Sequence, residues 1–144
     1  MANVNDVAKY FLFLVDPEAG DLISNLKLQK LIYYSQGFHL AMHNTPLFDD
    51  DVLAWDHGPV VESVYHSYKH FGSNAIQTPD GFDDSVLTET EKSLLKEVYE
   101  VFGQFSAWKL RNMTHSERPW LETPRNYPIE RELMKEYFKG FISE

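Results

Sequence analysis

The sequence of 144 residues contains no cysteine. This absence excludes a disulfide framework, a zinc site built from thiolates and a cysteine nucleophile. No apolar run approaches the ~20 residues that a membrane-spanning helix requires. The opening residues, MANVND, lack the basic region and apolar stretch of a secretory signal. We therefore expect a cytoplasmic protein.

Sequence motifs of known chemistry are missing as well. There is no glycine-rich phosphate loop and no Gly-x-Ser-x-Gly elbow for a nucleophilic serine. His39/His43 and His66/His70 are each spaced four apart, so either pair could face one metal ion from one helical turn. Neither pair carries the glutamate of a His-Glu-x-x-His zinc motif. Because no reaction has its full set of groups, we predict that the protein is not an enzyme and holds no metal or cofactor.

Positive charge is scarce. Lysine and arginine total 13 against 22 acidic residues, a net charge of −9, and the acidic excess lies within residues 1–100. Phosphate binding needs clustered cations, so nucleic acid is an unfavourable partner. An acidic surface instead suits a basic protein partner, although a role in solubility explains the charge equally well.

Apolar residues make up 43% of the chain and aromatic residues 15%, which is enough for a dense core. Apolar side chains recur at helical spacing in six segments. Their expected starts are, in order, an N-cap at Asn5 or Asp6, a helix over residues 25–43, Pro59, a capping box over residues 88–91, a cap at Ser106, and Pro128.

A minor β element is expected between the second and third helices. Residues 51–55 are too short for a helix and partly β-prone, so they predict a short strand, paired with residues near 75–77. Residues 72–86, rich in glycine and aspartate, predict a loop. The expected fold is mainly α, a compact bundle of about six helices with this short β element, forming one domain over residues 1–144.

Three patches mix aromatic and polar residues where a core segment would be apolar. The middle patch, residues 55–61, runs WDHGPVV. Gly58 allows a tight turn and Pro59 suits the first turn of a helix, so Asp56 and His57 are expected to project from an exposed corner beside Trp55. Such a corner would contact a partner or ligand. Alternatively, the histidine only hydrogen-bonds the start of the helix.

The other two patches also allow two interpretations. In residues 114–120, His115 and Glu117 could form an acid–base pair while Trp120 anchors an apolar contact, or the segment is a bend with the indole folded over the core. In residues 27–34, the side chains of Lys27, Lys30 and Tyr33 lie off the predicted core stripe. They would meet acidic groups of a partner, or the acidic residues 49–51 of this chain.

The order and spacing of the three patches resemble the Panacea domain, the SocA-like antitoxin family of prophage and bacterial toxin–antitoxin operons. The family pattern has a KLQKL-like helix with an aromatic pair, a W-x-x-G-P-V-like corner and a late H-x-E-x-P-W-like turn, and this sequence has all three in order. The resemblance implies an antitoxin that neutralises a cognate toxin by direct binding. Its partner-binding residues would be Lys27, Lys30, Tyr33, Trp55, Asp56, His57, Gly58, Pro59, His115, Glu117 and Trp120.

Other functions stay open on the sequence alone. One is a hydrolase, dependent on a metal or on His57, His115 and Glu117. Another is an adaptor that presents a partner protein to other machinery. A homo-oligomer is compatible with each of these functions, and the acidic surface would fit a basic toxin.

Overall fold

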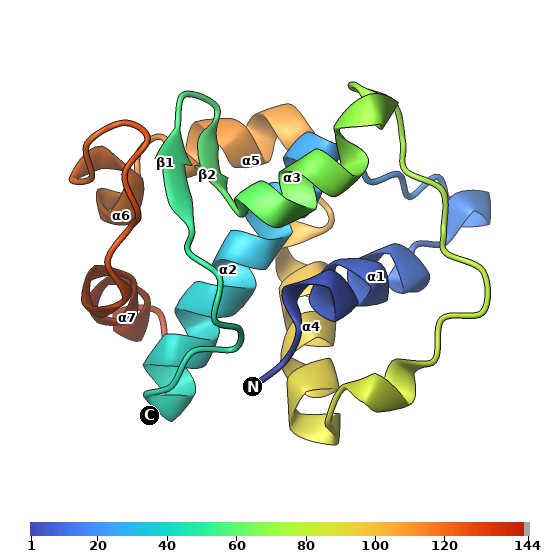
Figure 1. Cartoon of the computed structure of the whole chain (residues 1–144), viewed down its shortest axis with the longest axis horizontal. Helices are drawn as coiled ribbons and strands as arrows, with labels where there is room; N and C mark the ends of the chain where they lie inside the picture. The colour runs from blue at the N-terminus through green and yellow to red at the C-terminus, as the bar shows by residue number, and fades with distance from the viewer. Residues whose placement is uncertain (143–144) are drawn as a thin grey trace.

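The computed structural model describes residues 1–142 and shows, over that range, seven α-helices and one β-hairpin (Figure 1). The elements are α1 (Val4–Leu14), α2 (Asn25–His43), β1 (Leu53–Trp55), β2 (Gly58–Val60), α3 (Glu62–Tyr68), α4 (Glu89–Phe102), α5 (Ala107–Thr114), α6 (Arg118–Leu121) and α7 (Arg131–Lys139). Short 3-10 turns occupy Pro17–Ala19, Lys69–Phe71 and Asp84–Val86. The prediction of a mainly α fold is confirmed. No helix of the described range is long and apolar enough to cross a membrane.

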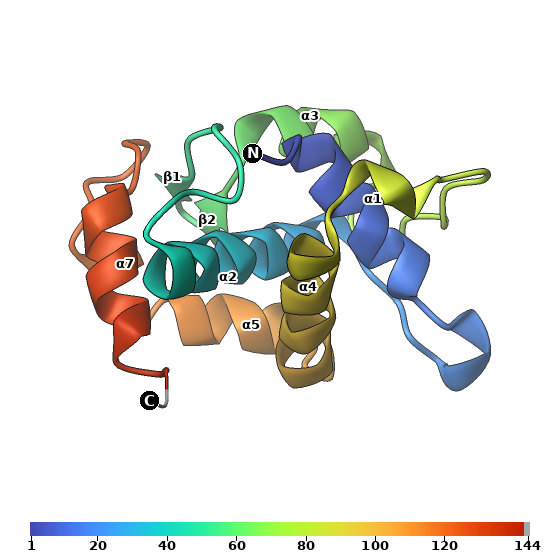
Figure 2. The same ribbon diagram turned by 90° about the horizontal axis from the view of Figure 1, so that it is seen from below.

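Helix α2 lies at the centre of the fold. Fourteen of its 19 residues are buried, and α1, α3, α4, α5, α7 and β2 all pack against it. Figure 2 shows α2 with α5 on one side and α3 on the other, between α7 and α4. Its predicted bounds are confirmed, because Ser24 caps its start and Asn44, in the left-handed region, ends it.

Because α2 is buried all round, its polar side chains must find partners inside the protein. Gln36 does so with both ends of its amide, since Nε2 donates to the Phe48 carbonyl (2.9 Å) and Oε1 accepts from the Leu47 N–H (2.7 Å). Gln29 accepts from the Val61 N–H (2.9 Å) in the same way. The central helix therefore holds the backbone of the segments that lead into and out of the hairpin.

The predicted starts of three helices are wrong. Asn3 caps α1, since its side chain accepts from the Asn5 N–H (2.8 Å). Pro59 lies in β2 and Pro128 forms a β-bridge with Leu53, so α3 and α7 begin several residues later. Proline's preset φ fits an extended segment as well as a first helical turn, so proline alone does not separate the two.

The predicted strand exists, but its predicted partner is wrong. β1 pairs antiparallel with β2, with Leu53 opposite Val60 and Trp55 opposite Gly58. A two-residue loop is the tightest hairpin connection, so the nearer segment pairs first. Residues 72–86 form the expected loop, apart from the turn at Asp84–Val86, and run along one edge of the molecule (Figure 1).

Helix α6 was absent from the prediction of six helices. Its four residues are fewer than two turns, so no apolar periodicity reports it. The capping box that opens α4 and the serine cap of α5 are both present as predicted.

Helix α7 packs directly on α2 at Gly37. A Cβ atom on Gly37 would overlap the ring of Phe138. The same ring packs on Phe38 (centroids 4.8 Å apart) and edge-on against Tyr33 (5.5 Å). The missing side chain therefore lets α7 bring an aromatic ring down onto the backbone of α2.

We expect Gly37→Ala to lower the free energy of unfolding by about 1–3 kcal/mol, although alanine favours helices, because the methyl group overpacks the Phe138 site. Urea denaturation measures the loss. Gly140→Ala is the matched control, since the new Cβ would meet its nearest neighbour only at 3.4 Å. Equal stability of the two variants would show that Phe138 moves aside freely.

Candidate functional site

The three sequence patches meet in space at the β-hairpin. The Trp120 Nε1–H donates to the Trp55 carbonyl (2.7 Å), which ties α6 to the end of β1. From α2, the Lys30 ammonium donates to the Pro59 carbonyl (3.2 Å). His115 Nε2 lies 2.7 Å from the Asp56 carbonyl oxygen. Three segments that are far apart in the sequence therefore form one corner.

Gly58 is required at this corner for two reasons. Its φ of 109° is one that residues with a side chain rarely adopt. A Cβ there would also lie 2.7 Å from Lys30 Cε and 2.8 Å from Thr114 Oγ1. The hairpin backbone thus rests directly on a lysine end and a threonine hydroxyl.

Lys30 itself is wholly buried. Burial, aided by the positive charge of Arg111, lowers its pKa to about 7. Loss of this proton lowers the cost of burying the amine beneath the hairpin, away from water.

The rings of His115 and Trp120 are in close, tilted contact beside the hairpin. Their ring centroids are 4.0 Å apart, and the guanidinium of Arg125 lies 3.6 Å from the centroid of the indole. His115 Nδ1 and Nε2 each lie 2.7 Å from a carbonyl oxygen, of Arg111 and Asp56 respectively. Carbonyl oxygens only accept, so both contacts are hydrogen bonds only when the imidazole is doubly protonated. His115 thus clamps α5 to the hairpin loop.

Glu117 points away from His115 into the protein. Tyr33 and Tyr34 donate their hydroxyl protons to its two carboxyl oxygens (2.9 and 2.8 Å). Burial raises its pKa to about 7, and the two tyrosine hydrogen bonds oppose that rise. No hydrogen bond joins Glu117 to His115 in residues 1–142. The acid–base pair suggested by the sequence is therefore not assembled.

The exposed part of the corner is its tip. Asp56 and His57 are exposed, and His57 Nδ1 accepts from Arg111 Nε (3.1 Å). The Arg111 guanidinium in turn lies 4.5 Å from the ring centroid of Trp108, an exposed indole on α5. The sequence prediction missed Trp108 and Arg111, and their spacing of three on one helix was the signal that could have joined them.

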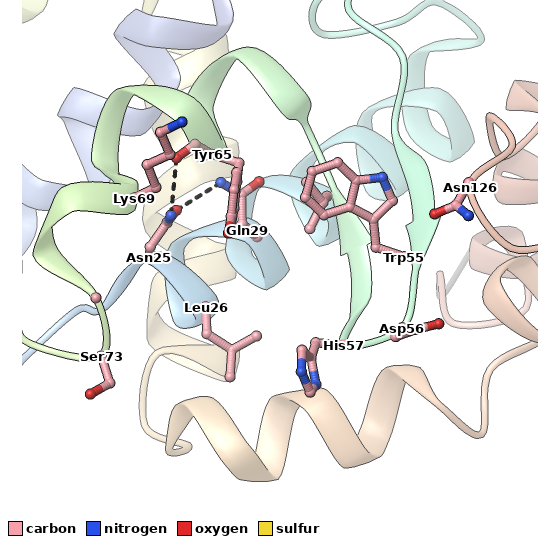
Figure 3. A pocket seen from close by; sticks show the side chains of 12 residues that line it. Asn25, Leu26, Gln29, Trp55, Asp56, His57, Tyr65, Lys69, Ser73 and Asn126 are labelled. Carbon is pink, nitrogen blue, oxygen red and sulfur yellow. Dashed lines mark hydrogen bonds between the residues drawn. The ribbon is translucent and has the colours of Figure 1, made fainter.

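Beside the tip opens a pocket of about 520 Å³ (Figure 3). Its apolar lining includes Leu26, Trp55 and Tyr65, and the two aromatic rings meet edge to face with centroids 5.0 Å apart. On one side of the pocket, Asn25 Nδ2 donates to the Tyr65 carbonyl (3.2 Å) and its Oδ1 accepts from Gln29 (2.9 Å), as the dashed lines of Figure 3 show. The pocket wall is thus held by hydrogen bonds as well as by packing.

The predicted partner-binding residues divide by burial. Asp56 and His57 are exposed, whereas Trp55, His115 and Trp120 are half-buried. The remaining predicted residues are buried, namely Lys27, Lys30, Tyr33, Gly58, Pro59 and Glu117. The exposed residues can touch a partner directly. Among the buried ones, Lys30 holds the corner in place, whereas Lys27 bonds to the Gly103 carbonyl and Glu117 to two tyrosines.

The prediction that Lys27, Lys30 and Tyr33 lie off the core stripe is wrong, because all three side chains are buried. The Lys27 ammonium donates to the Gly103 carbonyl (2.6 Å) and not to the acidic residues 49–51. Asp49 instead pairs with Arg131 (3.3 Å). A stripe pattern distinguishes inside from outside only when one face meets water, and residues 27–37 of α2 are all buried.

The two histidine pairs show no complete metal site. His39 Nδ1 lies 2.6 Å from the Thr45 carbonyl oxygen, and its ring packs against His43. Across residues 1–142, no three His, Cys, Asp or Glu side chains are grouped so as to hold an ion.

Comparison with known proteins identifies the family. The sequence profile described as "Antitoxin SocA-like, Panacea domain" matches residues 28–121, which run from α2 to α6 and contain most of the corner. The chain belongs to this family. Antitoxin SocA of Caulobacter vibrioides is 31% identical over 109 residues, which cover 68% of this chain and 58% of that protein. The chain thus spans less than two thirds of that relative's length. No solved structure shows a significant match.

The family assignment confirms the resemblance drawn from the three patches. The matched residues include the hairpin, the buried lysine Lys30 beneath it and the His115–Trp120 pair. The polar corner is therefore part of the segment that defines the family, and it is not a peripheral addition.

Gly58→Ala should lower the free energy of unfolding by about 2 kcal/mol or more, because it adds a clash with Lys30 and Thr114 to the cost of a positive φ. Chemical denaturation measures this effect. Gly20→Ala provides the control, because Gly20 has a φ of 86° but no atom within 4 Å of the new Cβ. The control should cost only about 1–2 kcal/mol of backbone strain. Equal losses would mean that the contact beneath the hairpin is not tight.

Glu117 should make stability depend on pH. Its pKa is about 7 in the folded protein against 4.5 when unperturbed, so the unfolded chain loses this proton first. The contribution of Glu117 to the free energy of unfolding is therefore greatest below pH 4.5. It falls by about 3 kcal/mol as the pH rises from 4.5 to 7. Glu117→Gln removes this dependence.

Denaturation of both proteins between pH 5 and pH 8 tests this linkage. Relative to the wild type, Glu117→Gln should gain about 2–3 kcal/mol of stability across that range. Glu122→Gln, which changes an exposed carboxylate, should gain nothing comparable. If the free energies of unfolding of the wild type and Glu117→Gln differ by the same amount at every pH, this carboxyl group has the same pKa in the folded and unfolded states.

Proposed function

We propose that this protein is an antitoxin that neutralises a cognate toxin by direct protein–protein binding. Membership of the SocA-like family supports this role, as does the relative whose name is Antitoxin SocA. The observation that carries the proposal is the corner itself. Asp56 and His57 are presented at an exposed tip, over a pocket built from Trp55 and Tyr65.

The corner suits binding because it is held in shape before a partner arrives. Lys30, Trp120 and His115 each hold a different hairpin carbonyl oxygen at hydrogen-bonding distance. A preorganised loop loses little conformational entropy on association, which leaves more of the contact energy for affinity. The exposed Trp108 and the half-buried Arg111 beside it are of the residue types that commonly dominate binding energy.

The same contacts favour sequestration of a toxin over turnover of a substrate. Both ring nitrogens of His115 face backbone carbonyls, and the carboxyl group of Glu117 faces two tyrosines. Side chains that are engaged in this way are poorly placed to exchange protons with a substrate. The net charge of −9 favours a basic toxin, since opposite charges speed encounter.

Co-expression with the product of the adjacent open reading frame tests the proposal. We expect the neighbour to be toxic alone, growth to recover in the presence of this chain, and the two proteins to co-purify. A harmless neighbour, or rescue without a complex, would contradict neutralisation by direct binding.

The corner is tested in the same assay by the double variant Asp56→Ala/His57→Ala. Both side chains are exposed, so the circular dichroism spectrum and melting temperature should stay close to those of the wild type. Rescue and co-purification should be weakened. Glu100→Ala, which changes an exposed residue of α4, serves as the control and should rescue fully. Full rescue by the double variant would place the contact elsewhere.

A further inference from the structure

Glu117 is unusual among the acidic residues of this chain. Within residues 1–142 it is the only aspartate or glutamate that is buried, with 8% of its surface exposed. Its two oxygens accept hydrogen bonds from Tyr33 and Tyr34. A carboxylate has about four acceptor sites, so each oxygen keeps capacity for a further donor.

This carboxyl group has no positive partner in the described part of the chain. Every ion pair found there involves other residues, and no cation contributes to its pKa. A buried carboxylate without a counter-ion is costly, which is why its pKa rises to about 7. The fold therefore retains an acid whose charged form it does not stabilise with a counter-ion.

A cavity of about 300 Å³ adjoins this group. It is distinct from the hairpin pocket and is formed between α2, the end of α4, the α5–α6 turn and α7. Glu117 is its only acidic lining residue, and six aromatic rings also line it: Tyr34, Phe38, Phe102, Tyr137, Phe138 and Phe141. The cavity reaches the surface beside Ser116 and Phe141, which are both exposed.

Aromatic rings enclose the cavity on several sides. Tyr34 stacks on Phe102 with centroids 4.0 Å apart and planes 5° from parallel. Tyr137 and Phe141 lie 5.2 Å apart at the open side. Aromatic faces attract cations, and guanidinium groups stack on them more readily than the strongly hydrated ammonium of lysine.

We infer that this cavity receives an arginine side chain of the partner protein, whose guanidinium pairs with Glu117 among the aromatic rings. The inference rests on the proposed antitoxin function and adds a second contact to the hairpin corner. An apolar side chain in the same place would bury the carboxyl group more deeply and would supply no positive charge to pair with it. An arginine supplies the missing positive charge and two parallel donors.

The cavity can be tested without the toxin, using N-acetyl-arginine amide as the probe. Titration into the isotopically labelled protein, followed by NMR, should give saturable shifts of Tyr34 and Tyr137 ring resonances. The uncharged citrulline analogue should bind at least about tenfold more weakly. Glu117→Gln, which keeps the shape and can still bond the tyrosines, should lose the same preference for arginine. Glu122→Gln, with its exposed carboxylate removed, should bind as the wild type does.

Equal binding of the arginine and citrulline probes, unchanged binding by Glu117→Gln, or no saturable shift at all would each overturn the inference. The co-expression assay separates this failure from failure of the antitoxin function. If Glu117→Gln forms the complex as tightly as the wild type, the antitoxin proposal stands and the arginine contact is wrong. If the wild type forms no complex, the antitoxin proposal fails, and the probe titration alone then decides whether the cavity binds a guanidinium.

Discussion

The fold depends on one constraint: α2 is surrounded by protein on every side, yet it carries several polar residues. Each such residue must be satisfied internally. Ser35 bonds to a carbonyl of α2 itself, whereas Lys27, Gln29, Lys30 and Gln36 bond to other segments of the chain. Lys27 holds the α4–α5 connection, Gln29 and Lys30 hold the hairpin and the start of α3, and Gln36 holds the segment before β1. The polar residues of the helix therefore position the loops, while its apolar residues form the core.

This arrangement links stability to the candidate binding surface. The hairpin tip is exposed, but its backbone is held from below by Lys30 and from the side by Trp120 and His115. Exposed residues at the tip can therefore vary without loss of the fold, whereas Gly58 cannot gain a side chain without displacing its support. Glu117 departs from this pattern, since its hydrogen bonds are satisfied but its charge has no partner in the described chain.

Much of the helical structure could be predicted from the sequence, because the signals were local. Caps at Ser24 and Asn44 bound α2, and the capping box opened α4. Pro59 and Pro128 misled the prediction because their preset φ fits both extended and helical starts. The pairing of β1 with β2 depends on the two-residue loop at residues 56–57. In the sequence, this loop is a weaker signal than the helical periodicity.

The candidate site was predicted in part. The composition of the three patches indicated a shared site, but not which side chains would be exposed. Lys30 was expected at a contact surface because it lies off the predicted core stripe, and Glu117 because it lies in the third patch. Their burial follows from the packing of five helices around α2, which is a property of the whole fold. The cavity beside Glu117 similarly needs rings from α2, α4 and α7 together.

Hydrogen–deuterium exchange of the protein alone and in complex with the neighbouring gene product tests the central claim most directly. The account predicts that the partner slows exchange of the hairpin amides and of the α5–α6 turn, with further protection around the aromatic cavity near the end of α4. It predicts little change in α1. The account would be contradicted if the partner protected only α1 and the acidic first turn of α4 and left the hairpin unaffected. Partner binding would then lie on a different face.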